Sequence, residues 1–198
     1  MSVGSLSVIG RWFSRFAQPL HGHCKMCVDN YMTALAVKDH VGFSIRSVDS
    51  LVEIVSILRE DSDLPVGTDL SLETARAIKC VFDNLAWSDG EMSKAEVQHL
   101  LNMIGQYEWL RNAYLQVDEV EPSARGINKI PNLIFLALDH DERKGTHYAA
   151  MLVNSLEMIA FGVITADGVA SQDELAKFRE HLVAMRQFLP NAGRKKRS

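Results

Sequence analysis

A short acidic motif occurs twice in the chain, and it constrains the fold more than any other feature. Residues 86–96 read AWSDGEMSKAE and residues 164–174 read ITADGVASQDE. In each copy an apolar stretch runs into Asp-Gly, a Ser follows, and a Glu stands seven residues after the Asp. Asp bonds the backbone two residues on and Gly tolerates positive φ, so each Asp-Gly predicts the sharp end of a helix.

The similarity continues on both sides of the motif at one fixed offset, the separation of Asp89 from Asp167. Before the motif, the apolar positions Ile78, Val81, Phe82, Leu85 and Ala86 correspond to Leu156, Ile159, Ala160, Val163 and Ile164. After it, Val97, Leu100 and Ile104 correspond to Leu175, Phe178 and Leu182. Spacings of three and four within each set place the residues on one helical face. The pattern predicts an internal duplication of a helix, an acidic turn and a second helix.

Two interpretations of the acidic turns are open. Ser93 with Glu96, and Ser171 with Glu174, match the S-x-x-E capping box that satisfies the first amide groups of a helix. On this interpretation the motif only ends one helix and begins the next.

The alternative is a shared metal site. Copies of one unit usually pack with their equivalent turns close together, which would gather Asp89, Glu96, Asp167 and Glu174 around one point. Four carboxylates there would repel each other unless a cation neutralised them, and oxygen ligands suit Ca²⁺, Mg²⁺ or Mn²⁺. An EF-hand is excluded by spacing, because neither copy supplies the oxygens before the Gly or a Glu at position twelve.

At these residues the chain resembles the tellurite-resistance TerB-like domain family. The resemblance covers roughly residues 71–189 and rests on the two Asp-Gly-x5-Glu motifs in register. It departs from the family at Ser88, where Ala is usual, and in the long stretch between the copies. Membership implies a compact all-helical bundle with an acidic metal-binding cluster and no catalytic activity. The implied ligands are Asp89, Glu96, Asp167 and Glu174, with Glu91 and Asp173 in second rank.

We therefore expect an all-α protein in three parts. These are an N-terminal helical extension (residues 1–70), a TerB-like helical domain (71–190) and a basic tail (191–198). The boundary falls in the loop from Asp61 to Gly67. The net charge is −4. Residues 1–20 and the tail contain six of the 21 basic residues and no acidic residue, so the rest of the chain, here called the body, holds 15 basic and 25 acidic residues. Such a body lacks the basic surface that nucleic acid requires.

The extension opens with an amphipathic pattern. Trp12, Phe13 and Phe16 lie on its apolar face, with arginines between them, and we expect this face to dock on the protein's own domain or on a partner, with a membrane surface as the alternative. The segment 21–27, HGHCKMC, offers zinc ligands, but its cysteines also continue an apolar helical stripe, which we prefer. Three cysteines form no secreted disulfide framework, so we expect a cytoplasmic protein, with membrane association as an option.

Further helices are expected from local patterns. One opens at Ser47, Ser71 caps the next, Thr146 caps the helix 147–166, and a closing helix covers 172–188. The strongly apolar helix 130–138 is expected at the centre of the bundle, with a polar cluster, Asp139 to Glu142, at its end. That cluster fits a solvated turn, metal ligands or a catalytic group.

Function follows from these alternatives. The first hypothesis is a non-enzymatic, cation-binding module of a stress-response or tellurite-resistance type complex, where the process comes from the resemblance. The second is a helical scaffold or peripheral membrane adaptor without a metal site. A metal-dependent hydrolase would need an open coordination position and a nearby base, and it ranks last because nothing in the sequence selects a substrate.

Overall fold

The described part of the protein consists of helices joined by loops. A computed structural model describes residues 40–85, 93–121, 130–166 and 172–189, and no strand occurs among them. In chain order the helices are α3 (His40–Arg59), α4 (Leu70–Leu85), α5 (Lys94–Ile104), α6 (Glu108–Val120), α7 (Asn132–Lys144), α8 (Tyr148–Ile164) and α9 (Gln172–Arg186). The prediction of an all-helical bundle is confirmed for these residues.

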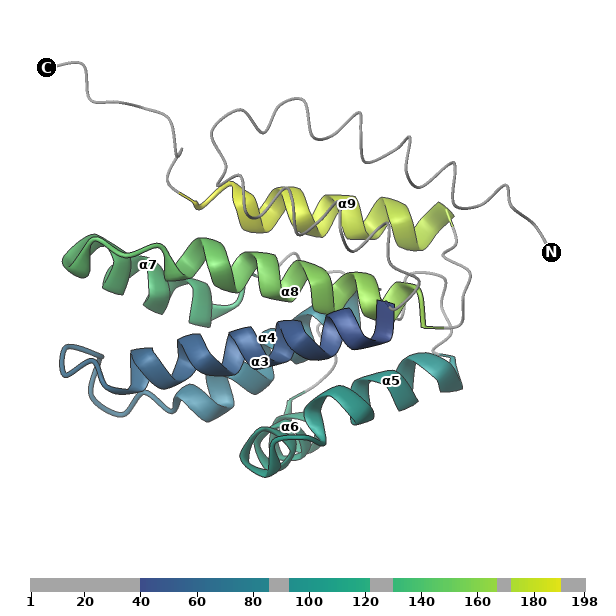
Figure 1. Cartoon of the computed structure of the whole chain (residues 1–198), viewed down its shortest axis with the longest axis horizontal. Coiled ribbons are helices and arrows are strands. Elements are labelled where there is room, and N and C mark those ends of the chain that lie inside the picture. Colours follow the sequence, from purple (N-terminus) through teal and green to yellow (C-terminus); the bar gives the residue numbers. More distant parts are fainter. Residues whose placement is uncertain (1–39, 86–92, 122–129, 167–171, 190–198) are drawn as a thin grey trace, which may run out of the picture. The chain divides into compact units, whose positions relative to one another are not determined.

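Helix α8 is the centre of the bundle. It packs against α3, α4, α5, α7 and α9, and every side chain from Ser155 to Ile164 is buried. Figure 1 shows α9 on one side of α8 and α3 with α4 on the other. A helix that is apolar all round must be covered all round, which explains this position. The sequence assigned the central place to residues 130–138, and this was wrong, because α7 leaves Phe135 exposed.

Helix α3 belongs to the same compact unit as the helices after it. That unit spans residues 40–189, and the main partner of α3 is α8. Val48, Leu51, Val55 and Leu58 form its buried stripe. The loop from Asp61 to Gly67, which the sequence suggested as a domain boundary, therefore connects two helices within one unit. The helix also starts at His40, a full two turns before the expected Ser47.

The start of α4 is fixed by Asp69. Its Oδ1 atom accepts hydrogen bonds from the backbone amides of Ser71, at 2.9 Å, and Leu72, at 3.2 Å. These are the bonds that an N-cap residue makes with the opening turn of a helix. The expected cap, Ser71, is already inside the helix, where its hydroxyl accepts a bond from Arg59.

The starts of four helices follow the offset seen in the sequence. Helices α4 and α8 begin at Leu70 and Tyr148, and α5 and α9 begin at Lys94 and Gln172. Both pairs of starts are separated by the same offset as the two motif aspartates. We call α4 with α5 the first helix pair and α8 with α9 the second helix pair. Helices α6 and α7 fill the stretch between them.

Candidate functional site

The helix that follows the first acidic motif opens with the predicted capping box. The Glu96 amide donates to Ser93 Oγ at 3.2 Å, and the Ser93 amide donates to Glu96 Oε2 at 2.7 Å. Glu96 is buried, with 4% of its surface exposed. The predicted capping box is therefore confirmed for this copy, and it fixes the carboxylate of one predicted metal ligand at the start of α5.

One turn after Glu96, α5 meets the C-terminal end of α8. His99 Nε2 lies 2.9 Å from Ser44 Oγ of α3, and both side chains are buried. Gly162 of α8 faces this pair, since an added Cβ would lie 2.5 Å from Ser44 Cβ and 2.8 Å from His99 Nε2. Only glycine permits such a close approach. Burial lowers the pKa of His99, which favours the neutral ring in this contact.

The contact at Gly162 brings the flanks of the two acidic motifs together. Helix α8 enters the second motif two residues after Gly162, and α5 leaves the first motif shortly before His99. In Figure 1 the C-terminal end of α8 and the N-terminal ends of α5 and α9 lie at the same end of the helix bundle. The helices next to both motifs thus converge, as the metal hypothesis requires.

The predicted ligands themselves are only partly covered by the structure. Asp89, Glu91 and Asp167 lie outside the described residues, as does the side chain of Glu174. Asp173 is exposed in the first turn of α9. Glu96 is the one first-rank ligand whose side chain is described, so the proximity of the four carboxylates stays a prediction.

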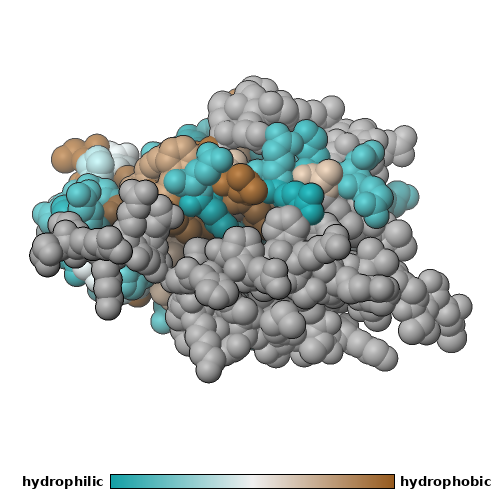
Figure 2. All heavy atoms as spheres, turned by 90° about the horizontal axis from the view of Figure 1, so that it is seen from above, coloured by the Kyte–Doolittle hydropathy of each residue, from teal (hydrophilic) through white to brown (hydrophobic). Residues whose placement is uncertain are grey.

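The proposed contact residues of the N-terminal extension, Trp12, Phe13 and Phe16, also lie outside the described residues, and so do Cys24 and Cys27. The third cysteine, Cys80, is buried in α4, in line with the apolar role expected for it. On the described surface, Phe135 of α7 and Phe188 after α9 stack edge to face, with ring centroids 5.3 Å apart. Figure 2 shows the described part of one face as small hydrophobic areas between hydrophilic ones.

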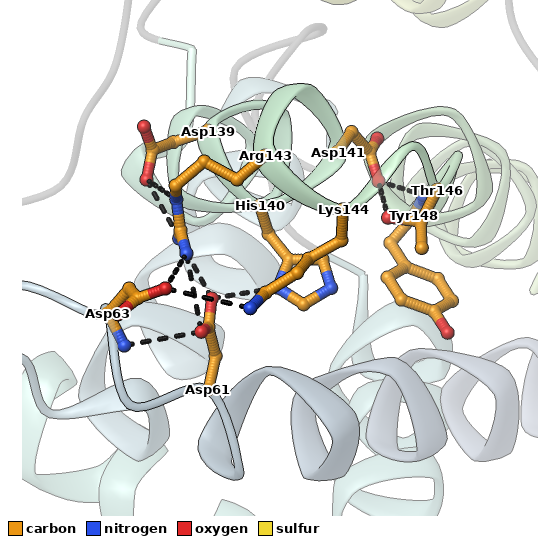
Figure 3. A network of polar contacts seen from close by, with 9 residues as sticks. All are labelled: Asp61, Asp63, Asp139, His140, Asp141, Arg143, Lys144, Thr146 and Tyr148. Atoms are coloured by element: carbon orange, nitrogen blue, oxygen red, sulfur yellow. Dashed lines mark hydrogen bonds and ion pairs between the residues drawn. The ribbon is translucent and has the colours of Figure 1, made fainter.

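The polar cluster at the end of α7 binds the loop between α3 and α4 (Figure 3). His140 Nδ1 lies 2.8 Å from Asp61 Oδ2, and Arg143 Nη2 lies 2.8 Å from the same oxygen. Arg143 Nη1 also reaches Asp63 Oδ2 at 2.9 Å. The bonds from Arg143 and His140 hold the pKa of Asp61 well below its usual range. We call Asp61, Asp63, His140 and Arg143 the loop clamp.

The loop clamp resembles a His–carboxylate pair in an enzyme, but its surroundings differ. Asp61 is shared between His140 and Arg143, whereas a catalytic carboxylate orients a histidine towards a nucleophile. The ring of His140 lies against Tyr148, with centroids 5.5 Å apart. The arrangement ties α7 to the α3–α4 loop, so the expected solvated turn was wrong at His140. Sequence reasoning missed Asp61 because it is far from His140 along the chain.

Asp141 in the same cluster caps the next helix. Its carboxylate accepts from the amides of Tyr148, at 2.7 Å, and Ala149, at 2.9 Å, and from the hydroxyl of Thr146, at 2.5 Å. The sequence assigned the cap of α8 to Thr146. The structure corrects this, because Thr146 only supports the aspartate that makes the cap.

Two buried charges occupy equivalent positions in the helix pairs. Lys79 of α4 lies 2.7 Å from Asp118 of α6 and 3.2 Å from Asp83. Glu157 of α8, which corresponds to Lys79 at the offset of the repeat, is fully buried and accepts two bonds of 2.5 Å from Arg186 of α9. Each charge links its helix to a later helix, but the signs are opposite.

The described residues hold no further metal candidate. Within residues 40–85, 93–121, 130–166 and 172–189, no three His, Cys, Asp or Glu side chains are arranged to hold an ion. None of the helices described is long and apolar enough to cross a membrane. The chain matches no family model, no curated protein and no solved structure.

Proposed function

We propose that the protein is a non-enzymatic TerB-like module that binds a divalent cation between its two acidic turns. The ligands are Asp89, Glu96, Asp167 and Glu174, and the ion is Ca²⁺, Mg²⁺ or Mn²⁺, which oxygen ligands favour. The resemblance adds that the module serves a stress-response or tellurite-resistance type complex.

One observation carries this proposal. The close approach of Gly162 to His99 sets the end of α8 against the start of α5, and these are the helix ends that lead into the second motif and out of the first. The equal spacing of the helix starts supports two copies of one unit, which would present equivalent carboxylates to each other.

The position of Glu96 is compatible with a second role. Its Oε2 atom accepts the bond from the Ser93 amide. An ionised carboxylate has about four acceptor positions, so one side chain is able to cap a helix and coordinate a cation. A cation would also remove the repulsion that several carboxylates exert at one end of a bundle.

Thermal unfolding in the presence of cations tests the proposal. An ion that binds only the folded state at a hundredfold excess over its Kd adds about 2.7 kcal/mol. For a chain of this size the Tm should rise by ~5–10 °C in millimolar Ca²⁺, Mg²⁺ or Mn²⁺. The double variant Asp89→Asn with Asp167→Asn should lose this rise.

The matched control changes two exposed carboxylates away from the motifs. Glu119 and Glu142 lie on α6 and α7 and are both exposed. The double variant Glu119→Gln with Glu142→Gln changes the net charge equally and should keep the full rise. If none of the three ions changes the Tm of the unaltered protein, the acidic turns are only helix caps and the proposal fails.

A further inference from the structure

Helix α9 is a peripheral helix held by one narrow face. It packs against α8 and α4, and Figure 1 shows it lying along α8. Among its described residues, Phe178 and Met185 are the fully buried apolar side chains, and the ring centroids of Phe178 and Phe161 of α8 are 6.2 Å apart. Most of its remaining described side chains are exposed. Apart from the bonds between Arg186 and Glu157, few of the described side chains of α9 are therefore buried in its docking.

A histidine lies in the middle of this face. His181 has 2% of its surface exposed, and neither ring nitrogen has a hydrogen-bond partner among the described residues. Burial lowers the pKa of His181 to about 4, against a smaller opposing effect of Glu180. A buried polar group without a partner costs stability, and a charged one costs more.

The first helix pair has no such group at the equivalent position. Met103 of α5 corresponds to His181 at the offset of the repeat and is likewise fully buried. An apolar thioether there carries no proton and needs no hydrogen bond. The same place in the repeated pattern is thus filled by an inert side chain in α5 and by a titratable one in α9.

The charged groups around α9 are already engaged. The titratable side chains of α4 and α8 are Glu73, Arg76, Lys79, Cys80, Asp83, Tyr148 and Glu157. Glu73 pairs with Arg76, Lys79 with Asp83, and Glu157 with Arg186 of α9.

On α9 itself, Lys177 lies one turn before His181, and Glu180 directly precedes it. They form an exposed ion pair at 3.2 Å. Glu180 is the carboxylate that favours the charged ring, and water screens it at the surface. The surroundings of His181 therefore offer little to compensate a positive charge.

We propose that His181 makes the docking of α9 sensitive to acid, so that proton uptake releases α9 from α8 and α4 while the other helices stay folded. Release exposes the imidazole to water and uncovers the side of α8 that carries Phe161. The chain thereby holds a concealed apolar surface that mild acid reveals.

The direction follows from the two protonation states. Released α9 has an ordinary histidine and binds a proton more readily than docked α9, so acid favours release. The stability of docking is complete above pH 6.5 and falls as the pH drops towards 4. With pKa values of 6.5 and about 4, the equilibrium shifts ~30-fold towards release at pH 5.

Amide hydrogen exchange of the full chain measures this release. Peptides from α9 should lose ~30-fold in protection between pH 7.5 and pH 5, after correction for the intrinsic rate. Peptides from α4 and α7 should change by less than about threefold. Equal losses in all helices would mean global unfolding and would overturn the proposal, as would an unchanged α9.

Two variants assign the effect to one side chain. His181→Met copies Met103 and should make the protection of α9 independent of pH in this range. His147→Gln removes an exposed histidine from the start of α8 and should leave the acid response intact. A response that persists in His181→Met excludes His181 as its cause. The ring titration of His181, followed by NMR in the unaltered protein, must give a pKa well below 6.5.

Discussion

The starts of the two helices are equally far apart in both helix pairs, yet the two pairs are packed differently in the bundle. In the first pair, α4 packs against five helices and is buried from Ala77 to Asp83, and α5 packs against α3, α6 and α8. In the second pair, α8 is enclosed by five helices and α9 lies outside it. The helix starts thus keep one spacing in the two pairs, while the residues that differ between the pairs determine how firmly each helix is held.

The buried charges illustrate this difference. Lys79 is shared between Asp83 and Asp118, and Asp118 is half exposed. Glu157 has no exposed surface and accepts hydrogen bonds from Nε and Nη2 of Arg186. Loss of one partner should therefore be tolerated in the first pair and severe in the second.

The largest expected effect tests this contrast directly. Arg186→Leu removes the guanidinium from a fully buried carboxylate and should lower the free energy of unfolding by about 3 kcal/mol. Asp118→Asn leaves Lys79 beside Asp83 and should cost less than about 1 kcal/mol. Urea denaturation of both variants gives the comparison.

A double variant separates the lost pair from lost packing. Glu157→Leu combined with Arg186→Leu removes both charges and should recover most of the stability, because an apolar pair suits the site. Equal losses for Arg186→Leu and Asp118→Asn would show that the two buried charges are held alike and would remove the contrast between the helix pairs.

A second contrast concerns close packing. Gly162→Ala should cost about 2 kcal/mol, because the new methyl group would overlap Ser44 and His99. Asn84, the equivalent residue of α4, is half buried and bonds only within its own helix, to the Cys80 carbonyl. Asn84→Ala should be within about 0.5 kcal/mol of neutral, since higher helix propensity offsets the lost bond. Thermal denaturation of the two variants measures the difference, and a tolerated alanine at position 162 would refute the close approach.

The smallest effect sharpens the comparison at the acidic motifs. Ser93→Ala removes the confirmed cap of α5 and should cost about 1 kcal/mol. Ser171→Ala should cost the same if the second motif repeats the capping box. Ser50→Ala, on the exposed side of α3, serves as control and should be neutral or slightly stabilising. A neutral Ser171→Ala would restrict the box to the first copy.

Local patterns in the sequence predicted the parts of the structure that depend on neighbouring residues. Apolar spacings of three and four gave the helices, and the S-x-x-E motif gave the cap made by Ser93 and Glu96. Both are decided within a few residues, so no knowledge of tertiary packing is needed. Asp69 was missed as a cap because Ser71, two residues later, is an equally suitable residue type.

Contacts between distant residues could not be predicted in the same way. Asp61 and Arg143 are 82 residues apart, and Asp141 caps amides seven and eight residues ahead of it. No local sequence pattern around these residues indicates which distant residues they bond. The pairing of Glu157 with Arg186 likewise depends on the packing of α9 on α8, which no local pattern shows. For the candidate metal site, the carboxylates were identified from the sequence, and the structure adds that the end of α8 lies near the start of α5.

The central place of α8 has a consequence for synthesis of the chain. Helix α3 leaves the ribosome long before α8, whose last residue is Ile164, and its apolar stripe has no partner of comparable size until then. Most of the polypeptide must therefore be made before its core closes. During that interval the nascent chain exposes apolar surface that is prone to aggregation. The yield of folded protein in cells should therefore depend on chaperones that shield this surface.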